Sequence, residues 1–304
     1  MRRDRSNRNE ASLMGSGLSF NKFGMIRDVT IPNLQITIFS KERIKMSFFN
    51  RMMASVGIGA TKVDTLLEKT SYYPGEDIRG VVRIEGGQVE QKIEGIDLSI
   101  MTYYVKEVND SKVQQNVELG RIRVAPPLTV MPNEKKEIGF SFRLAPNTPL
   151  SIGRTPVWIK TTADIRSAMD PTDNDRIEVI PSNPMNVVLR AIESLGFRLR
   201  EAETVYAPRL GDASPFVQEF EFVPQSGPYR GRLDELELVF LRNRITELEL
   251  LLQIDRKGSS LFGMFAEAMD MDESFVRVTV SQSDIERGPE HVATLLHNVI
   301  QRYA

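Results

Sequence analysis

The sequence predicts a mainly β fold of two antiparallel β-sandwiches joined by a helix. Three observations lead to this prediction. Apolar residues recur at every second position through most of residues 61–180 and again through residues 197–280. Pro and Gly turns separate these stretches, and helical spacing is confined to short segments between or beyond them. A period of two with frequent turns is typical of antiparallel sheets, whereas strands alternating with helices would indicate a parallel sheet.

The first block of strands occupies residues 61–180. Ile78, Val82 and Ile84 alternate with more polar neighbours, and residues 96–103 and 138–144 repeat this period. Between such segments lie turn sequences that combine Pro with Gly or Asn, at 73–76, 131–133 and 145–147. Each segment is therefore predicted to be a strand with one buried face.

A helix is predicted between the two blocks, over residues 183–196. Ser182 and Asn183 are candidate N-cap residues, Pro184 suits the first helical turn, and Gly196 follows the last apolar residue of the stripe. We interpret this helix as a linker between two units. Residues 46–182 are predicted to form a short N-terminal helix followed by a sandwich, and residues 197–304 a second sandwich with a C-terminal helix.

The second block resumes the strand pattern and ends in a helix. Alternating segments lie at 197–205, 216–223, 233–240, 246–254 and 276–280. Val292, Leu296 and Ile300 then fall on one helical stripe, together with Leu295 and Val299. We expect this C-terminal helix to pack on the second sandwich.

Residues 1–45 differ from the rest of the chain because they hold nine Lys or Arg and four Asp or Glu. Residues 29–39 allow a hairpin around Pro32 and Asn33, but we expect an extension without fixed structure. The phrase that opens at Met46 is typical of a native start, so residues 1–45 are expected to be disordered or over-annotated. A nucleic-acid arm is the disfavoured alternative, since only three aromatic residues interleave with the charges.

Composition excludes several classes of function. The chain has 39 Lys and Arg against 41 Asp and Glu, so no global field attracts nucleic acid. The absence of cysteine excludes disulfides, thiolate metal sites and a cysteine nucleophile, and it fits a reducing compartment. No apolar run reaches the roughly 18 residues of a membrane span. We therefore expect a cytoplasmic protein, with membrane contact disfavoured.

Several phrases resemble a known family. Residues 72–87 carry a Pro-Gly-Glu turn, a strand and a Gly-Gly turn, and residues 93–100 continue as a strand, which resembles the opening of arrestin-like domains. Residues 161–171, 217–222, 229–237 and 252–256 extend the likeness to the bacterial sporulation-control family, the SpoOM family. The resemblance runs from about Met46 to the end. It implies two arrestin-like sandwiches and a non-enzymatic cytoplasmic regulator that acts through protein contacts in sporulation or cell development.

Candidate metal and catalytic groups favour structural roles. His291 and His297 are six residues apart, about 240° around a helix, so they cannot chelate one ion as an i, i+4 pair would. Residues 170–178 are acidic but lack the glycine and the final glutamate of a calcium loop, and we interpret them as an acidic turn before a strand. Asp234, Glu235 and Glu237 are interpreted as solvent-facing charges. We predict no catalytic residue, metal or cofactor.

Two apolar segments are the candidate interaction surface. Their apolar side chains recur at helical spacing and need a surface to pack on. That surface is either the chain's own sandwich or, in the docking alternative, a partner protein or a second copy of this chain. The candidate residues are Phe48, Phe49, Met52, Met53, Leu261, Phe262 and Phe265. An open edge strand is a further way to bind an extended peptide. The rival functions are a peripheral membrane adaptor and a ligand-binding or hydrolytic sandwich.

Overall fold

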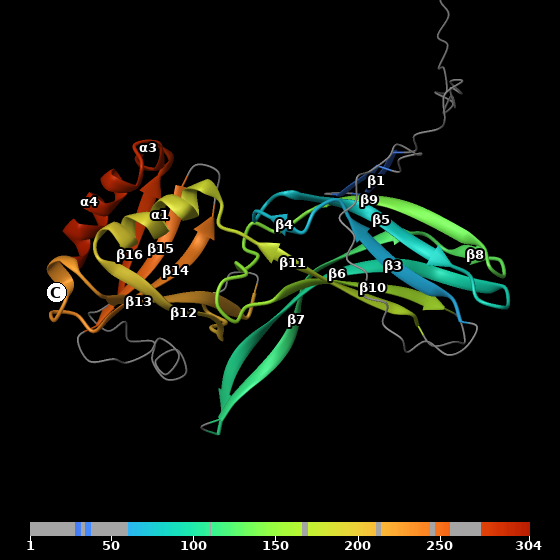
Figure 1. Ribbon diagram of the computed structural model, residues 1–304, viewed down its shortest axis with the longest axis horizontal. Coiled ribbons are helices and arrows are strands. Elements are labelled where there is room, and N and C mark those ends of the chain that lie inside the picture. The colour runs from blue at the N-terminus through green and yellow to red at the C-terminus, as the bar shows by residue number, and fades with distance from the viewer. Residues whose placement is uncertain are drawn as a thin grey trace, which may run out of the picture.

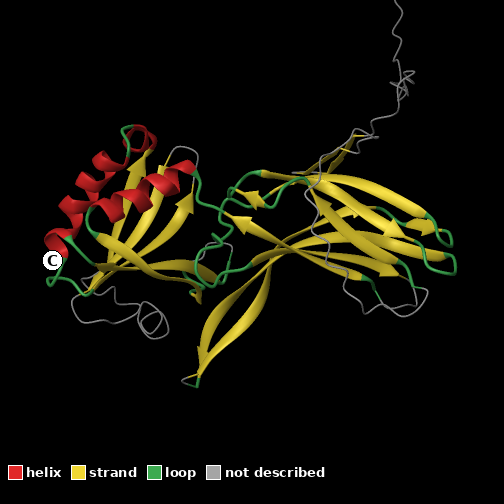
Figure 2. Cartoon of the chain, viewed as in Figure 1, coloured by secondary structure: helices red, strands yellow, loops and turns green. Residues whose placement is uncertain are grey.

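The computed structural model describes residues 28–31, 34–37, 60–109, 111–165, 170–210, 214–243, 247–255 and 275–304. Strands dominate these residues, and three helices gather at the C-terminal end of the molecule (Figures 1 and 2). The predicted mainly β fold is confirmed. The first half, residues 60–180, and the second half, residues 183–304, lie end to end along the long axis (Figure 1).

One sheet of the first half has three strands in antiparallel order. β3 (Lys62–Leu67) pairs with β5 (Asp77–Glu85), and β5 pairs with β9 (Lys135–Arg143). In β5 the predicted alternation is confirmed, because Ile78 and Val82 are fully buried between exposed or half-buried neighbours. This alternation exists because successive side chains of a strand point to opposite faces.

The facing sheet is built around the long strand β6 (Gln91–Val108). Its other strands in the first half are β10 (Val157–Ile165), β11 (Thr172–Val179), β4 (Ser71–Tyr72), β7 (Ser111–Ala125) and β8 (Leu128–Val130). Buried residues from both sheets, Ile96, Leu98 and Phe140 among them, belong to one hydrophobic core. The first half is therefore the β-sandwich that the sequence predicts.

β6 also joins the two halves into one sheet. Val105, near its end, forms a parallel bridge with Val205 of β12. The strands that follow are antiparallel neighbours: β12 (Phe197–Tyr206), β13 (Phe216–Pro224), β14 (Glu235–Asn243), β15 (Glu247–Asp255) and β16 (Phe275–Ser281). One backbone ladder therefore runs through both halves.

Helices cover one face of the second sheet (Figure 1). They are α1 (Asn183–Ser194), α3 (Gln282–Glu286) and α4 (Pro289–Ile300), and a short 3₁₀ turn, η1 (Gly227–Tyr229), precedes β14. Val188 and Ile192 of α1 and Leu296 of α4 are fully buried in the core that these helices share with the sheet. The expected C-terminal helix is confirmed.

The layer architecture of the second half differs from our expectation. Among the described residues its strands form a single sheet, and helices take the place of the second sheet of a sandwich. The 183–196 segment is a helix as predicted, but it is a core element rather than a free linker. Its apolar stripe is long enough to need a partner surface, and the open face of the second sheet supplies it.

The ends of α1 follow the predicted signals in part. Pro184 lies in the first turn and Ser182 is the N-cap, although the Ser182 side chain makes no capping hydrogen bond. Gly196 follows the helix with a φ of +92°, and a Cβ there would collide with the carbonyl oxygen of Ser226. Glycine is therefore required at this turn.

The N-terminal region is described at two short strands only. β1 (Asp28–Ile31) pairs antiparallel with β2 (Leu34–Thr37), which is the hairpin that we had disfavoured for this segment. The rest of residues 1–45, the expected N-terminal helix and the proposed start at Met46 lie outside the described residues.

Candidate functional site

The predicted interaction residues lie outside the described part of the chain. This holds for Phe48, Phe49, Met52 and Met53 of the first segment and for Leu261, Phe262 and Phe265 of the second. Their role as a docking surface stays a prediction. The described residues bring together a different site, at the junction of the two halves and on the hairpin that starts there.

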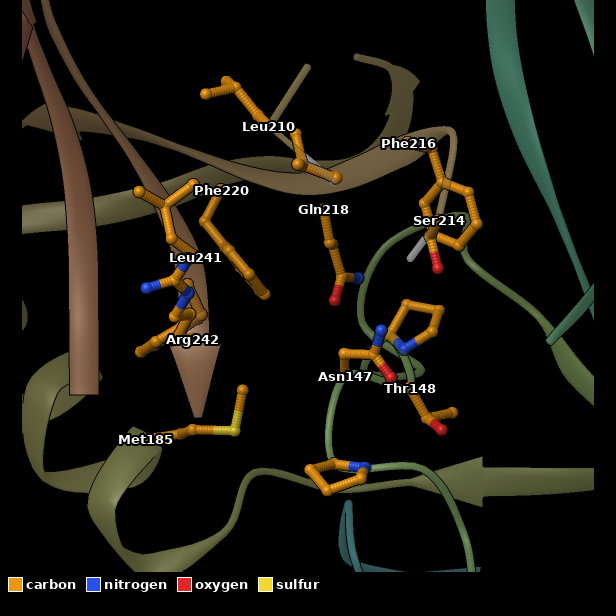
Figure 3. Close-up of a pocket in the computed structure, with 14 residues that line it drawn as sticks. Asn147, Thr148, Met185, Leu210, Ser214, Phe216, Gln218, Phe220, Leu241 and Arg242 are labelled. Carbon is orange, nitrogen blue, oxygen red and sulfur yellow. The ribbon is translucent and has the colours of Figure 1, made fainter. Parts of the chain in front are cut away.

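A pocket of about 330 Å³ lies at the junction (Figure 3). The loop of residues 146–149 borders it from the first half, and Met185 of α1 with the ends of β13 and β14 borders it from the second. The apolar lining includes Phe216, Phe220 and Leu241, and Gln218 lies at the centre of the view (Figure 3). The volume falls at the lower end of the range for small-molecule pockets.

Two polar groups of this pocket are already engaged within the chain. Gln218 is engaged with Leu150, and Arg242 lies 3.5 Å from Glu249. The described residues that line the pocket include no Asp, Glu, His or Lys. Such groups are the usual general acids and bases of enzymes.

Close backbone contacts fix the two halves against each other. Thr204 Oγ1 of β12 donates to the carbonyl oxygen of Tyr103 in β6 at 2.5 Å. Tyr103 Oη in turn donates to the carbonyl of Arg154. Gly153 approaches Ala202 so closely that a Cβ on Gly153 would lie 2.5 Å from the Ala202 oxygen. The junction is therefore tightly packed on this side.

An aromatic cluster anchors the base of a long hairpin. The Tyr104 ring stacks on Tyr206 at 5.7 Å and on Phe216 at 5.8 Å between ring centroids. Lys106 Nζ lies 4.3 Å from the Tyr206 centroid, a cation–π contact. These contacts join β6 to the second half just before β6 leaves the body of the molecule.

Beyond this anchor, the end of β6 and the start of β7 project from the body as a two-stranded hairpin (Figures 1 and 2). Val108 is 46% exposed and Val113 is 48% exposed, although both are apolar. The first six side chains of β7 are all exposed. Among the described strands β7 pairs with β6 alone, so its outer edge presents free backbone groups.

Buried carboxylates lie on the face of the second sheet opposite the helices. Glu235 is 4% exposed and Glu237 is 1% exposed, so our interpretation of them as solvent-facing charges was wrong. Register explains the burial, because Glu237 lies opposite Glu221 of β13 on one side and Gln253 of β15 on the other. A Glu-Leu-Glu-Leu alternation gave no signal that both faces of this strand are covered.

Ion pairs and hydrogen bonds offset part of the free-energy cost of burying these carboxylates. Arg200 forms ion pairs with Glu221 and with Glu235, the latter at 2.6 Å. Burial raises the pKa of Glu219 to about 7, and the Glu203 and Glu235 carboxylates act in the same direction, while a hydrogen bond from Glu237 opposes them. Glu219 is therefore largely protonated in mildly acidic solution.

The acidic segment 170–178 is also placed differently from our interpretation. Thr172–Val179 is strand β11, so most of these acids lie in a strand rather than in a turn before one. Asp173 Oδ2 accepts from the backbone N–H of Thr65 at 2.8 Å. Burial, with Asp173 and Asp64 nearby, raises the pKa of Asp175 to about 8. The Asp173 side chain therefore links β11 to β3 of the facing sheet.

The comparison with known protein families decides what kind of chain this is. The family model described as SpoOM protein matches residues 49–258. The chain belongs to the SpoOM family. The match covers the whole sandwich, the junction and the hairpin, and it confirms the resemblance that the sequence motifs indicated.

Relatives agree with this assignment. The sporulation-control protein spo0M of Bacillus subtilis (strain 168) is 42% identical over 259 residues, which cover 85% of this chain and 100% of the relative. The crystal structure of Spo0M from Bacillus subtilis superposes with a TM-score of 0.77 at 41% identity and covers 81% of this chain and 100% of that one. Sporulation control is thus the role of the family to which this chain belongs.

The histidines of this SpoOM-family chain have side-chain partners far from the junction pocket. His291 Nε2 lies 2.9 Å from Asp284 Oδ1, and His297 Nδ1 lies 2.7 Å from Tyr229 Oη. Asp284 belongs to the capping box of α3 with Ser281. Within the described residues no group of three or more His, Asp or Glu is arranged to hold a metal ion, and no helix there has the length and apolarity of a membrane span.

Proposed function

We propose that this SpoOM-family chain is a non-enzymatic cytoplasmic regulator that acts in sporulation or developmental control by binding proteins. The observation that carries the proposal is the hairpin of β6 and β7, which projects from the body with an open strand edge. A free edge can accept an extended strand through main-chain hydrogen bonds, a recurring mode of protein recognition.

The side chains of the hairpin support this function. Two exposed valines, Val108 and Val113, lie near its tip, whereas folded proteins usually protect long edges with bulges, prolines or charges. The aromatic anchor of Tyr104 holds the hairpin to both halves. A rigidly held edge loses little conformational entropy when it binds a partner.

The junction pocket supports the proposal that the chain is not an enzyme. Among the described residues its lining has no carboxylate, histidine or lysine, and its central polar group, Gln218, is already bonded to the backbone of Leu150. The cytoplasmic part rests on the absence of cysteine, which fits a reducing compartment. The apolar segments around Phe49 and Phe265 remain the proposed second docking surface.

The test removes the hairpin and retains the body. Residues 107–112 are replaced by Asn-Gly, a two-residue hairpin turn, because Lys106 and Val113 lie opposite each other as a hydrogen-bonded pair in the β6–β7 register. The full chain and this variant are each expressed in the native host in place of the chromosomal copy. Crosslinked proteins captured with each chain are compared, and so is the frequency of sporulation or the equivalent developmental phenotype.

We expect the shortened chain to lose its captured proteins and to show the phenotype of the gene deletion. A variant with Val89→Ser and Met131→Ser, two exposed apolar residues outside the hairpin, is the matched control and is expected to behave as the unaltered chain. A shortened chain that is folded, captures the same proteins and supports normal development would overturn the proposal.

A further inference from the structure

We propose that the outer edge of β7 pairs antiparallel with the same edge of a second copy of this chain, with Gln115 on the twofold axis. The inference rests on the proposed function, since it names one partner for the hairpin edge. Three features carry it: the direction in which the backbone groups of β7 point, the positions of its charges, and its exposed valines.

The backbone direction follows from the contacts of β6. The carbonyl of Tyr103 accepts from Thr204 of β12, so it points away from β7. In an antiparallel pair, when the backbone N–H and C=O of one residue point away from the partner strand, those of the residue opposite also point away. Asn116 lies opposite Tyr103, and its N–H and C=O therefore point outward from the hairpin.

Every second residue of β7 has its backbone N–H and C=O on the same side as those of Asn116. Residues 112, 114, 116 and 118 present outward-facing N–H and C=O groups, and the bulge in the β6–β7 register comes only after Glu118. Two such edges related by a twofold axis through Gln115 place Gln114 opposite Asn116 of the second copy. These are hydrogen-bonded pairs, in which each pair of residues exchanges two N–H···O bonds.

The charges select this register. Lys112 and Glu118 lie three residues to either side of Gln115. The axis at Gln115 therefore places Lys112 directly opposite Glu118 of the second copy, and symmetry repeats the pair. An axis shifted by one residue would put Lys112 opposite Asn116 or Gly120 instead. Directly opposed charges of opposite sign stabilise a strand pair, whereas like charges destabilise it.

Apolar contacts fall on the other face of the ribbon. In this register Val113 lies opposite Val117 of the second copy, in the closely spaced pairs without hydrogen bonds. Val113 is 48% exposed and Val117 is half-buried in the single chain, so both gain burial on pairing. A two-stranded contact of this length is smaller than a standard protein interface, which predicts weak, concentration-dependent association.

The test is a charge swap in the purified full-length chain, read by sedimentation velocity from about 1 µM to about 1 mM, the range in which weak complexes form. We expect the unaltered chain to show a monomer–dimer equilibrium. Lys112→Glu and Glu118→Lys should each weaken dimerisation about tenfold or more, because each places two pairs of like charges opposite each other. The double variant should restore dimerisation to within about threefold of the unaltered chain.

Restoration is specific to the proposed register. Lys112 and Glu118 are six positions apart on one strand, roughly 20 Å, so they do not compensate each other within a chain. Lys112 also pairs with Glu203 at 3.3 Å in its own chain. Glu203→Gln breaks that pair without changing the edge, and it is expected to leave dimerisation unchanged.

A second variant tests the backbone pairing itself. Asn116→Pro removes an N–H that points away from β6, and proline is tolerated on an edge in that orientation. We expect the hairpin to stay folded by circular dichroism and thermal unfolding, and dimerisation to be lost. A chain that is monomeric throughout the concentration range, or a double swap no better than the single variants, overturns the inference.

The two proposals fail separately. The purified chain could be monomeric while its hairpin is still needed to capture proteins in the cell. This result would refute self-pairing but not the proposed function, and another protein would then bind the edge. Dimerisation that follows the charge swap, with a hairpin that is dispensable in the cell, would refute the proposed function alone.

Discussion

Gln218 on β13 holds both polar groups of the Leu150 backbone across the junction. The Leu150 N–H donates to Oε1 at 2.7 Å, and Nε2 donates to the Leu150 carbonyl at 2.8 Å. A single amide side chain thus completes the backbone bonding of a loop in the other half. This pair sets the geometry of the pocket, because the loop and β13 are two of its walls.

Replacing Gln218 with Ala should lower the free energy of unfolding by about 2 to 4 kcal/mol, since it leaves a buried N–H and a buried C=O without partners. Chemical denaturation of the two proteins measures the difference. Gln282→Ala, at an exposed position on α3, is the control and should change stability by less than about 0.5 kcal/mol. Equal effects of the two substitutions would refute the bridging role of Gln218.

Gly153→Ala should destabilise the junction through a direct collision. Gly153 has a φ of +65°, and a Cβ there would meet the Ala202 oxygen at 2.5 Å. We expect a loss of about 2 to 4 kcal/mol, which combines backbone strain with the displacement of β12. Gly231→Ala is the matched control, because Gly231 has a φ of +76° and open space around its Cβ position. Its loss, from backbone strain alone, should be about 1 kcal/mol, and a Gly153→Ala protein no less stable than this control contradicts the close contact.

Glu219 makes stability depend on pH. Its pKa is about 7 in the folded chain, mainly because of burial, against an ordinary value of 4.5. Between these two values the folded chain holds a proton that the unfolded chain has lost. Unfolding therefore releases a proton, and stability falls as the pH rises from about 4.5 to about 7.

Glu219→Gln should remove this contribution. The variant should match the unaltered chain near pH 4 and exceed its stability at pH 8 by up to about 3 kcal/mol. Thermal and chemical unfolding across this range measure the difference. Glu201→Gln, at an exposed position of β12, should leave the slope unchanged. A Glu219→Gln protein with the same pH dependence as the unaltered chain would show that the Glu219 carboxyl is not shifted.

Tyr104 should control the order of the hairpin. Tyr104→Ala removes a ring that stacks on Tyr206 and Phe216, and we expect a loss of about 3 kcal/mol together with faster amide hydrogen exchange in β6 and β7 beyond residue 104. Tyr104→Phe retains the ring and loses only the 2.8 Å bond to Gln115, so it should cost under about 1 kcal/mol. Unchanged exchange in Tyr104→Ala would contradict the anchoring role.

Local pattern was enough to predict strands such as β5 and the helices α1 and α4. The alternation around Ile78 and Val82 is dictated by burial of one face, and the helix before Gly196 is delimited by residues whose backbone preferences act locally. These signals depend on a residue and its near neighbours, so the sequence contains them in full.

Packing partners were not predictable in the same way. The stripe of α1 required a partner surface but did not say whether a sheet or a helix layer would face it. Glu237 reads as a solvent-facing charge in an alternating strand, and only its register against Glu221 and Gln253 reveals its burial. Gln218 and Leu150 are 68 residues apart, so no local signal connects them. The open edge of β7 likewise follows from which strands are absent beside it in the described sheet.

The most direct test of the account is site-specific photo-crosslinking in the native host. A photoreactive residue is placed at Gln114, on the outer edge of β7, and in a separate strain at Lys135, an exposed position of β9. The account predicts protein adducts from position 114, a dimer of this chain among them, and none from position 135. No adduct at 114, or the same adducts from both positions, would contradict the claim that this chain acts through its hairpin edge.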